Sequence, residues 1–286
     1  MTFKVTPEQA IGFMQKSVAV AFTWPLSSTA SKRQVLVHKI LQVFTAFISF
    51  TFSLALLYST YVNRHDTFII ICLSPDVALQ YIIEEMMVCV KEASTREREV
   101  FQKYVDRCRI VYPCAIVWYY MCLGSWMLSP ILLPQPLPTD AEYPFSTDSL
   151  FRLSIVYIHQ YISGAQIAGA MSHSGFAALL LWFTAARFEC LMLELQETSD
   201  ARMLIKCIKK QIQLRRYARQ VVSCFRLNVA AAVVLSTLGL QIMVHEFFVQ
   251  NVTVFFTILL QIFVYAWPAD KLKEMVSSAL LNNFFA

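Results

Sequence analysis

Long apolar stretches separated by polar segments dominate this chain, and they predict helices that cross a membrane. The stretch 40–62 is the clearest, because its 23 residues carry no charged side chain. A helix needs about 20 apolar residues to cross a bilayer, whereas a core helix of a soluble protein shows a polar face at every turn. We therefore predict an all-α, polytopic membrane helical bundle, a single domain over 1–286, with six transmembrane helices at about 40–62, 67–90, 110–133, 151–185, 227–249 and 252–268.

The polar segments between these stretches differ in charge, and this difference predicts the orientation of the chain. Most of the 24 lysine and arginine residues lie in 1–39, 91–109, 187–219 and the C-terminal tail. Because cytoplasmic loops are enriched in Lys and Arg, we place the N-terminus in the cytoplasm, and six spans return the C-terminus to the same side. The Pro-rich, acidic segment 129–150 then faces outward, and we expect it to form a lid without regular structure.

Composition and missing motifs exclude several classes of function. Hydrophobic residues make up 57% of the chain and charged residues 15%, against about 45–50% and 25% in soluble domains. This excludes a disordered or nucleic-acid-binding protein and makes the lipid bilayer the expected environment. The sequence contains no Walker P-loop, GxGxxG, HExxH, GxSxG or CxxC motif, and His245-Glu246 lacks the second histidine of a zinc site. We therefore expect no enzyme, no cofactor and no metal.

The segment 7–22 is predicted to form an amphipathic helix. Thr6 and Gln9 have the spacing of a capping box, and Pro7 suits the first position of a helix. This helix either lies on the inner membrane surface or packs on the bundle, and its apolar face contains Ile11, Met14, Val18 and Phe22.

Acidic residues in and near the second predicted span are unusual, because a carboxylate at membrane depth costs a few kcal/mol. Asp76 follows Pro75, which is expected to kink the helix, and it is either a polar feature of a cavity or sheltered within the bundle. Glu84 and Glu85 lie near the cytoplasmic end and are expected to be solvated. Asn251 begins an Asn-Val-Thr sequon in a short outer turn and is a glycosylation candidate, although chance explains it equally simply.

Aromatic and polar side chains gather near the outer ends of the third and fourth predicted spans. A mixed surface of aromatic residues and Met suits a pocket for small apolar molecules, and nearby polar tips can orient a ligand by hydrogen bonds. Tyr and Trp are also enriched at membrane interfaces, and polar tips also bond neighbouring helices. The candidate ligand-binding residues are Tyr120, Leu123, Trp126, Met127, Tyr157, Gln160 and Tyr161.

The basic segment 187–225 is predicted to be helical. It has an intermittent apolar face that includes Ile205, Ile208, Ile212 and Tyr217. This segment is either a solvated surface beside lipid headgroups or an extension into the cytosol that contacts partner subunits.

The segment 261–272, QIFVYAWPADKL, resembles the QxFxYxxPxDxL signature of the insect odorant receptors, with Ala266 where the family often has Cys. Weaker similarities follow the family's order in 143–145 with Tyr157 and Gln160, in 212–218 with Phe225, and in 235–237. The resemblance covers nearly the whole chain and indicates an odorant-specific tuning subunit. The signature residues are Gln261, Phe263, Tyr265, Pro268, Asp270 and Leu272.

The resemblance implies a seven-span receptor that binds small volatile odorants between the outer halves of its helices. With a common odorant receptor coreceptor it would form a hetero-tetrameric, ligand-gated cation channel in the plasma membrane of olfactory sensory neuron dendrites. The chain stops before the position of the family's seventh span, which lines the pore. We therefore expect a C-terminally truncated chain that does not conduct, with retention in the endoplasmic reticulum as an alternative fate.

Two other classes of protein are alternatives. A gustatory receptor of the same superfamily would show a TYxxxxxQF-like segment in a last span, which is absent here. A membrane transporter would show inverted repeats and helices broken at the midplane, and apart from Pro75 the sequence has neither.

Overall fold

The computed structural model describes residues 5–19, 30–63, 76–132, 136–139, 143, 145, 147, 149–198, 200–243 and 248–285. Within these ranges the regular structure is entirely α-helical, which confirms the predicted all-α fold class. The helices are α1 (Pro7–Ala19), α2 (Lys32–Asn63), α3 (Asp76–Glu92), α4 (Thr95–Cys108), α5 (Val111–Met127), α6 (Ser129–Leu132), α7 (Leu150–Gln196), α8 (Ala201–Met243) and α9 (Phe248–Phe285).

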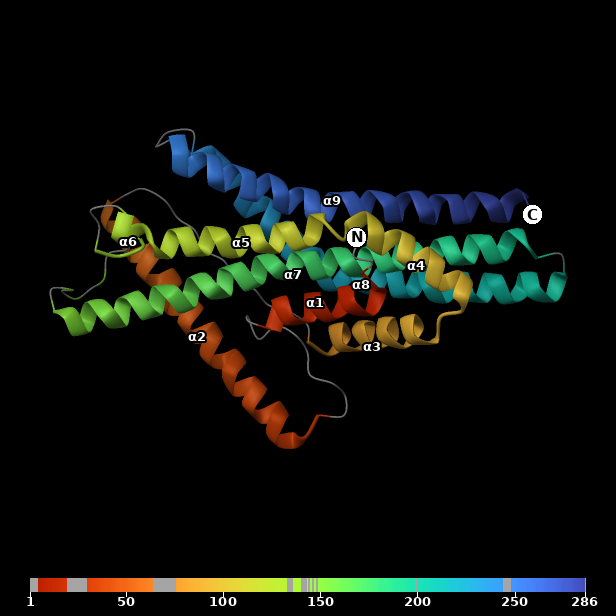
Figure 1. The fold of residues 1–286 in the computed structure, drawn as a ribbon, viewed down its shortest axis with the longest axis horizontal. Coiled ribbons are helices and arrows are strands. Elements are labelled where there is room, and N and C mark those ends of the chain that lie inside the picture. Colours follow the sequence, from red (N-terminus) through yellow and green to blue (C-terminus); the bar gives the residue numbers. More distant parts are fainter. Residues whose placement is uncertain are drawn as a thin grey trace.

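The bundle is built around α7. This helix contacts α1, α2, α4, α5, α8 and α9. Figure 1 shows α7, α8 and α9 running together along the long axis, with α5 beside them and α2 crossing obliquely near the end that carries α6. We call that end, where α5 ends and α7 begins, the outer end, following the predicted orientation, and the opposite end the inner end.

The central position of α7 follows from its sequence. Every residue from Ser172 to Ala186 is buried, and small side chains in this run let neighbouring helices approach closely. Its hydroxyl groups need no partner on another helix, because Ser172 donates to the carbonyl of Ala168 at 2.9 Å and Thr184 donates to that of Leu180 at 2.7 Å. The helix can therefore be buried on all sides without leaving these donors unpaired.

The length of α7 exceeds what a membrane crossing needs. Its 47 residues correspond to about 70 Å at 1.5 Å per residue, while the hydrocarbon core is about 30 Å thick. The predicted stretch 151–185 is thus part of a longer helix that extends beyond the bilayer. Among the described residues, two helical segments are long and apolar enough to cross a membrane, Thr95–Ile131 and Leu150–Gln196; the other spans remain predictions.

The segment 91–109, which the sequence analysis treated as a loop, is largely helical, and that expectation was wrong. Only residues 93 and 94 separate α3 from α4. Ser94 caps α4, because its hydroxyl accepts a hydrogen bond from the amide of Glu97 at 3.4 Å and its own amide donates to the Glu97 carboxylate at 2.8 Å. This capping box starts the helix immediately after the turn.

The two ends of the described chain also refine the predictions. The capping box of Thr6 and Gln9 is present, with the Thr6 amide donating to Gln9 Oε1 at 3.0 Å and the Gln9 amide to Thr6 Oγ1 at 3.3 Å. Ile11 and Met14 are buried and α1 packs on α7, as in the bundle-packed alternative. At the other end, the predicted span 252–268 is part of a longer helix that continues through Pro268 to Phe285.

An ion pair joins α3 to α7 in the inner half of the bundle. Arg187 donates to Glu85 at 2.7 Å, and both side chains are mostly buried, so the expectation that Glu85 is solvated was wrong. The Arg187 guanidinium also lies 5.0 Å from the centre of the Tyr217 ring on α8. The Tyr217 hydroxyl donates to the carbonyl of Ile82 at 3.2 Å, and burial raises the pKa of this phenol, so it remains a neutral donor. We call Glu85, Arg187 and Tyr217 the inner clamp.

Replacing Arg187 by Met should destabilise the protein, because Glu85 would keep its partly buried charge without a partner. We expect a loss of about 1–3 kcal/mol in the free energy of unfolding, measured by thermal unfolding of the detergent-solubilised chain. Arg96→Met is the matched control, since Arg96 pairs with Glu197 where both side chains are largely exposed, and it should leave the melting temperature unchanged. Equal effects of the two substitutions would contradict the clamp.

Candidate functional site

The outer ends of α5 and α7 meet at a glycine. A Cβ atom placed on Gly164 would lie 2.4 Å from Cζ3 of Trp126 and 2.7 Å from Cδ1 of Leu123. Only glycine therefore allows the side chains of α5 to approach α7 this closely. Met127, on the last turn of α5, is buried beside them, and its carbonyl accepts a hydrogen bond from the Tyr157 hydroxyl at 2.9 Å. We call Leu123, Trp126, Met127, Tyr157 and Gly164 the outer cluster.

Gln160 fastens part of the lid segment to α7. Its side chain is fully buried; Oε1 accepts from the amide of Thr139 at 3.2 Å, and Nε2 donates to the Tyr143 hydroxyl at 3.3 Å. Leu137 of the same segment is buried. The lid begins with the single turn α6, and its described residues beyond α6 form no further regular structure, in keeping with the prediction. Gln160 thus bonds the lid across the outer end of the helices.

The structure brings together five of the seven candidate ligand residues. Leu123, Trp126, Met127 and Tyr157 belong to the outer cluster, and Gln160 lies one helical turn from Tyr157 on α7. The other two lie elsewhere. The Tyr120 hydroxyl donates to the carbonyl of Ser17 on α1 at 3.2 Å, and Tyr161 is 53% exposed on the surface of α7.

Partners of this region were missed by sequence reasoning. The lid residues Thr139 and Tyr143 bond Gln160, and Thr51 of α2 shares a hydrogen bond of 3.0 Å with His159. These residues carry no pattern of their own, and only their contacts in space reveal them.

The signature segment of α9 holds that helix against α5 and α7. Tyr119 donates to Gln261 Oε1 at 2.8 Å, and Gln261 Nε2 donates to the hydroxyl of Ser174. All three residues are buried, so this chain of hydrogen bonds links three helices inside the apolar bundle. Nearby, Trp118 donates to Thr257 at 2.9 Å, again joining α5 to α9. We call Tyr119, Gln261 and Ser174 the polar link.

The other signature residues divide between packing and surface. Tyr265, Pro268 and Leu272 are buried, whereas Asp270 is exposed. Phe263 is largely exposed and stacks on Trp267 with ring centres 5.4 Å apart. The described structure therefore gives the signature a role in seating α9.

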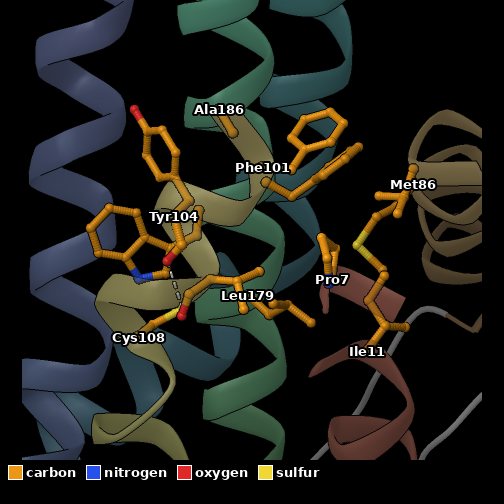
Figure 2. A pocket seen from close by; sticks show the side chains of 12 residues that line it. Pro7, Ile11, Met86, Phe101, Tyr104, Cys108, Leu179 and Ala186 are labelled. Carbon is orange, nitrogen blue, oxygen red and sulfur yellow. Dashed lines mark hydrogen bonds between the residues drawn. The ribbon is translucent and has the colours of Figure 1, made fainter. Parts of the chain in front are cut away.

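An apolar cavity lies away from the outer cluster, between α1, α3, α4 and α7. Figure 2 shows Ile11 and Met86 on one side and Tyr104, Cys108 and Leu179 on the other. Its volume is about 30 Å³, much less than the roughly 150 Å³ of a protein cavity that admits benzene. An odorant does not fit there in this conformation, and none of the candidate ligand residues lines the cavity.

The remaining candidate residues give little further chemistry. Asp76 is the first residue of α3, and Pro75 lies outside the described residues. Asn251 falls in the first turn of α9, with its side chain outside the described part of the chain. Among the described residues, no group of three His, Cys, Asp or Glu side chains could hold a metal ion.

Comparisons with known proteins agree with this architecture. A family model described as 7tm Odorant receptor matches residues 36–285. The chain resembles the structure of the insect olfactory receptor OR5 from Machilis hrabei, with a TM-score of 0.69 and 14% identity over 95% of this chain and 81% of that chain. The same receptor in complex with eugenol gives a TM-score of 0.66 and 14% identity, over 96% and 89%. No curated protein gives a match.

Substituting Gly164 by Ala should destabilise the contact between α5 and α7. The added methyl group would overlap the Trp126 ring, which has little freedom to move, and overpacking of this kind costs about 1–3 kcal/mol. Gly124→Ala is a matched control, because a Cβ at Gly124 meets nothing within 4 Å and Ala favours a helix over Gly. Thermal unfolding in detergent should show a lower melting temperature for Gly164→Ala alone; a loss in both variants would point to a general effect of the methyl group.

Proposed function

This chain belongs to the 7tm odorant receptor family, and on that premise we propose that it binds a small volatile odorant at the outer cluster and gates a cation channel formed with a coreceptor. Members of the family are membrane-embedded, multi-pass receptors. Family membership therefore confirms that the chain is not an enzyme, and it decides between the odorant receptor and the gustatory receptor or transporter alternatives.

The single observation that supports the location is the outer cluster beneath a fastened lid. Trp126, Leu123 and Met127 offer an apolar and aromatic surface, and Tyr157 supplies a hydroxyl group beside it. Such a surface favours ligands that are mostly apolar and carry one hydrogen-bonding group. Eugenol, which is bound by the Machilis hrabei receptor, belongs to this chemical class and is a suitable first probe.

The lid gives the proposed site a way to respond to a ligand. The Gln160 amide already makes two hydrogen bonds to lid residues. A ligand whose oxygen competes for Gln160 would weaken the attachment of the lid, and a ligand that only fills apolar space would leave it in place. A ligand shifts such an equilibrium only by its difference in affinity for the two states. We therefore assign the ligand's polar group, rather than its size, to the gating step.

The polar link provides a route from the site to α9. Tyr119 and the cluster residues Leu123 and Trp126 lie on the same helix, α5, so a displacement of α5 changes the geometry of Tyr119 with Gln261. Because Gln261 has its partners on α5 and α7, α9 must follow or break a buried hydrogen bond, which costs about 1–3 kcal/mol. In the proposed receptor this coupling transmits ligand binding to the channel.

Binding is tested first on the purified chain in nanodiscs, with eugenol and a panel of small alcohols, ketones and phenols, by intrinsic tryptophan fluorescence. We expect at least one volatile to bind saturably and Tyr157→Ala to weaken it about tenfold. Tyr161→Ala, four residues away on the exposed surface, should leave the affinity unchanged. If no volatile binds, or if both variants weaken binding equally, the outer cluster is not the site.

The channel is tested separately, by recording currents from cells that express the chain with a coreceptor. A volatile that binds the purified chain should evoke an inward cation current. Binding without current would contradict the gating proposal while leaving the ligand site intact.

A further inference from the structure

The inner part of α8, before the predicted fifth span at 227, presents an apolar stripe that no other element covers. Ile205, Ile208 and Ile212 are 55%, 41% and 57% exposed. Their spacing of three and four residues places them on one helical face. The opposite face holds the helix to the bundle through buried residues such as Cys207 and Leu214, and Gln211 donates to the carbonyl of Ala279 on α9 at 3.1 Å.

The charge around the stripe has one sign. Residues 201–225 contain no Asp or Glu, and their seven basic residues are Arg202, Lys206, Lys209, Lys210, Arg215, Arg216 and Arg219. Among the described residues, Lys210 is the one member of this set that forms an ion pair, with Glu194 at 2.7 Å. The other cations leave a strongly positive border around three exposed isoleucines.

The position of the stripe excludes lipid as its cover. Figure 1 shows the start of α8 at the end of the bundle opposite α6, running parallel to α7 and α9. From Ile205 to residue 226 the helix rises about 30 Å, so the stripe projects well beyond the predicted span. A helix that stands along the bundle axis does not lie in a membrane surface, as an interfacial amphipathic helix does.

We propose that this stripe docks into the apolar groove of an acidic soluble protein on the inner side of the membrane, of the kind that calcium-sensing EF-hand proteins expose. Residues at i, i+3 and i+7 are the anchors by which a helix enters such a groove. A Met-rich groove adapts to branched apolar side chains, and acidic residues around it match the cationic border. A second copy of this chain is a poor partner, because it would place the same positive surface against the first.

The proposal is tested with the full chain in nanodiscs and calcium-loaded calmodulin as the probe, measured by biolayer interferometry. We expect saturable binding that is lost on calcium removal, when the probe closes its groove. The double substitution Ile205→Ser with Ile212→Ser should weaken binding at least about tenfold, as should the charge reversal Lys209→Glu with Arg216→Glu. Ile155→Ser, at an equally exposed position on the outer end of α7, should have no effect.

Three outcomes would overturn the proposal. The first is the absence of saturable binding by the unsubstituted chain, and the second is equal weakening by Ile155→Ser. The third is a different occupant: self-association of the chain, or binding to phosphatidylserine vesicles, that depends on Ile205 and Ile212. The thermal unfolding of each variant shows whether a loss of binding reflects a loss of fold. None of these measurements uses a volatile, so their failure is distinguishable from failure of the odorant proposal.

Discussion

Burial of α7 on all sides is the constraint on which the rest of the structure depends. A run of fifteen residues, from Ser172 to Ala186, is inaccessible to solvent, so each neighbouring helix must fit a surface that is already fixed. Hydroxyl groups in this run bond to carbonyls one turn earlier in the same helix. This satisfies polar groups locally and leaves the outside of α7 free for close packing. The glycine at 164 extends the same principle to the outer end, where α5 makes its closest approach.

Buried polar groups between helices then fix which surfaces meet. The polar link and the inner clamp each join three helices through groups that would be costly to leave unpaired in an apolar interior. His173 is a different case, because neither of its ring nitrogens has a hydrogen-bond partner, and its ring packs against Phe176 and Phe225 at 5.9 and 5.5 Å. An unpaired buried polar group costs about 1–3 kcal/mol, so packing around α7 must outweigh that cost.

The apolar stretches were enough to predict the helical class, because hydrophobic length is a property of each segment alone. Local signals worked equally well where both partners are close in sequence, as with Thr6 and Gln9. The same signal at Ser94 and Glu97 was present but unread, which is why α4 was taken for a loop. Gln160 was correctly chosen as a residue of interest, yet its partners lie 17 and 21 residues away in an irregular segment. Likewise, Glu85 and Arg187 are 102 residues apart, and no periodicity announces such a pair.

The great length of the central helices has a mechanical consequence. α7, α8 and α9 contain 47, 43 and 38 residues, so each is a rod of about 55–70 Å. A rod of this length acts as a lever: a rotation of about 5° about one end displaces the other by about 5–6 Å, close to one helical turn. A change too small to disturb the packing at the outer end is thereby enlarged at the inner end into a movement the size of a side chain.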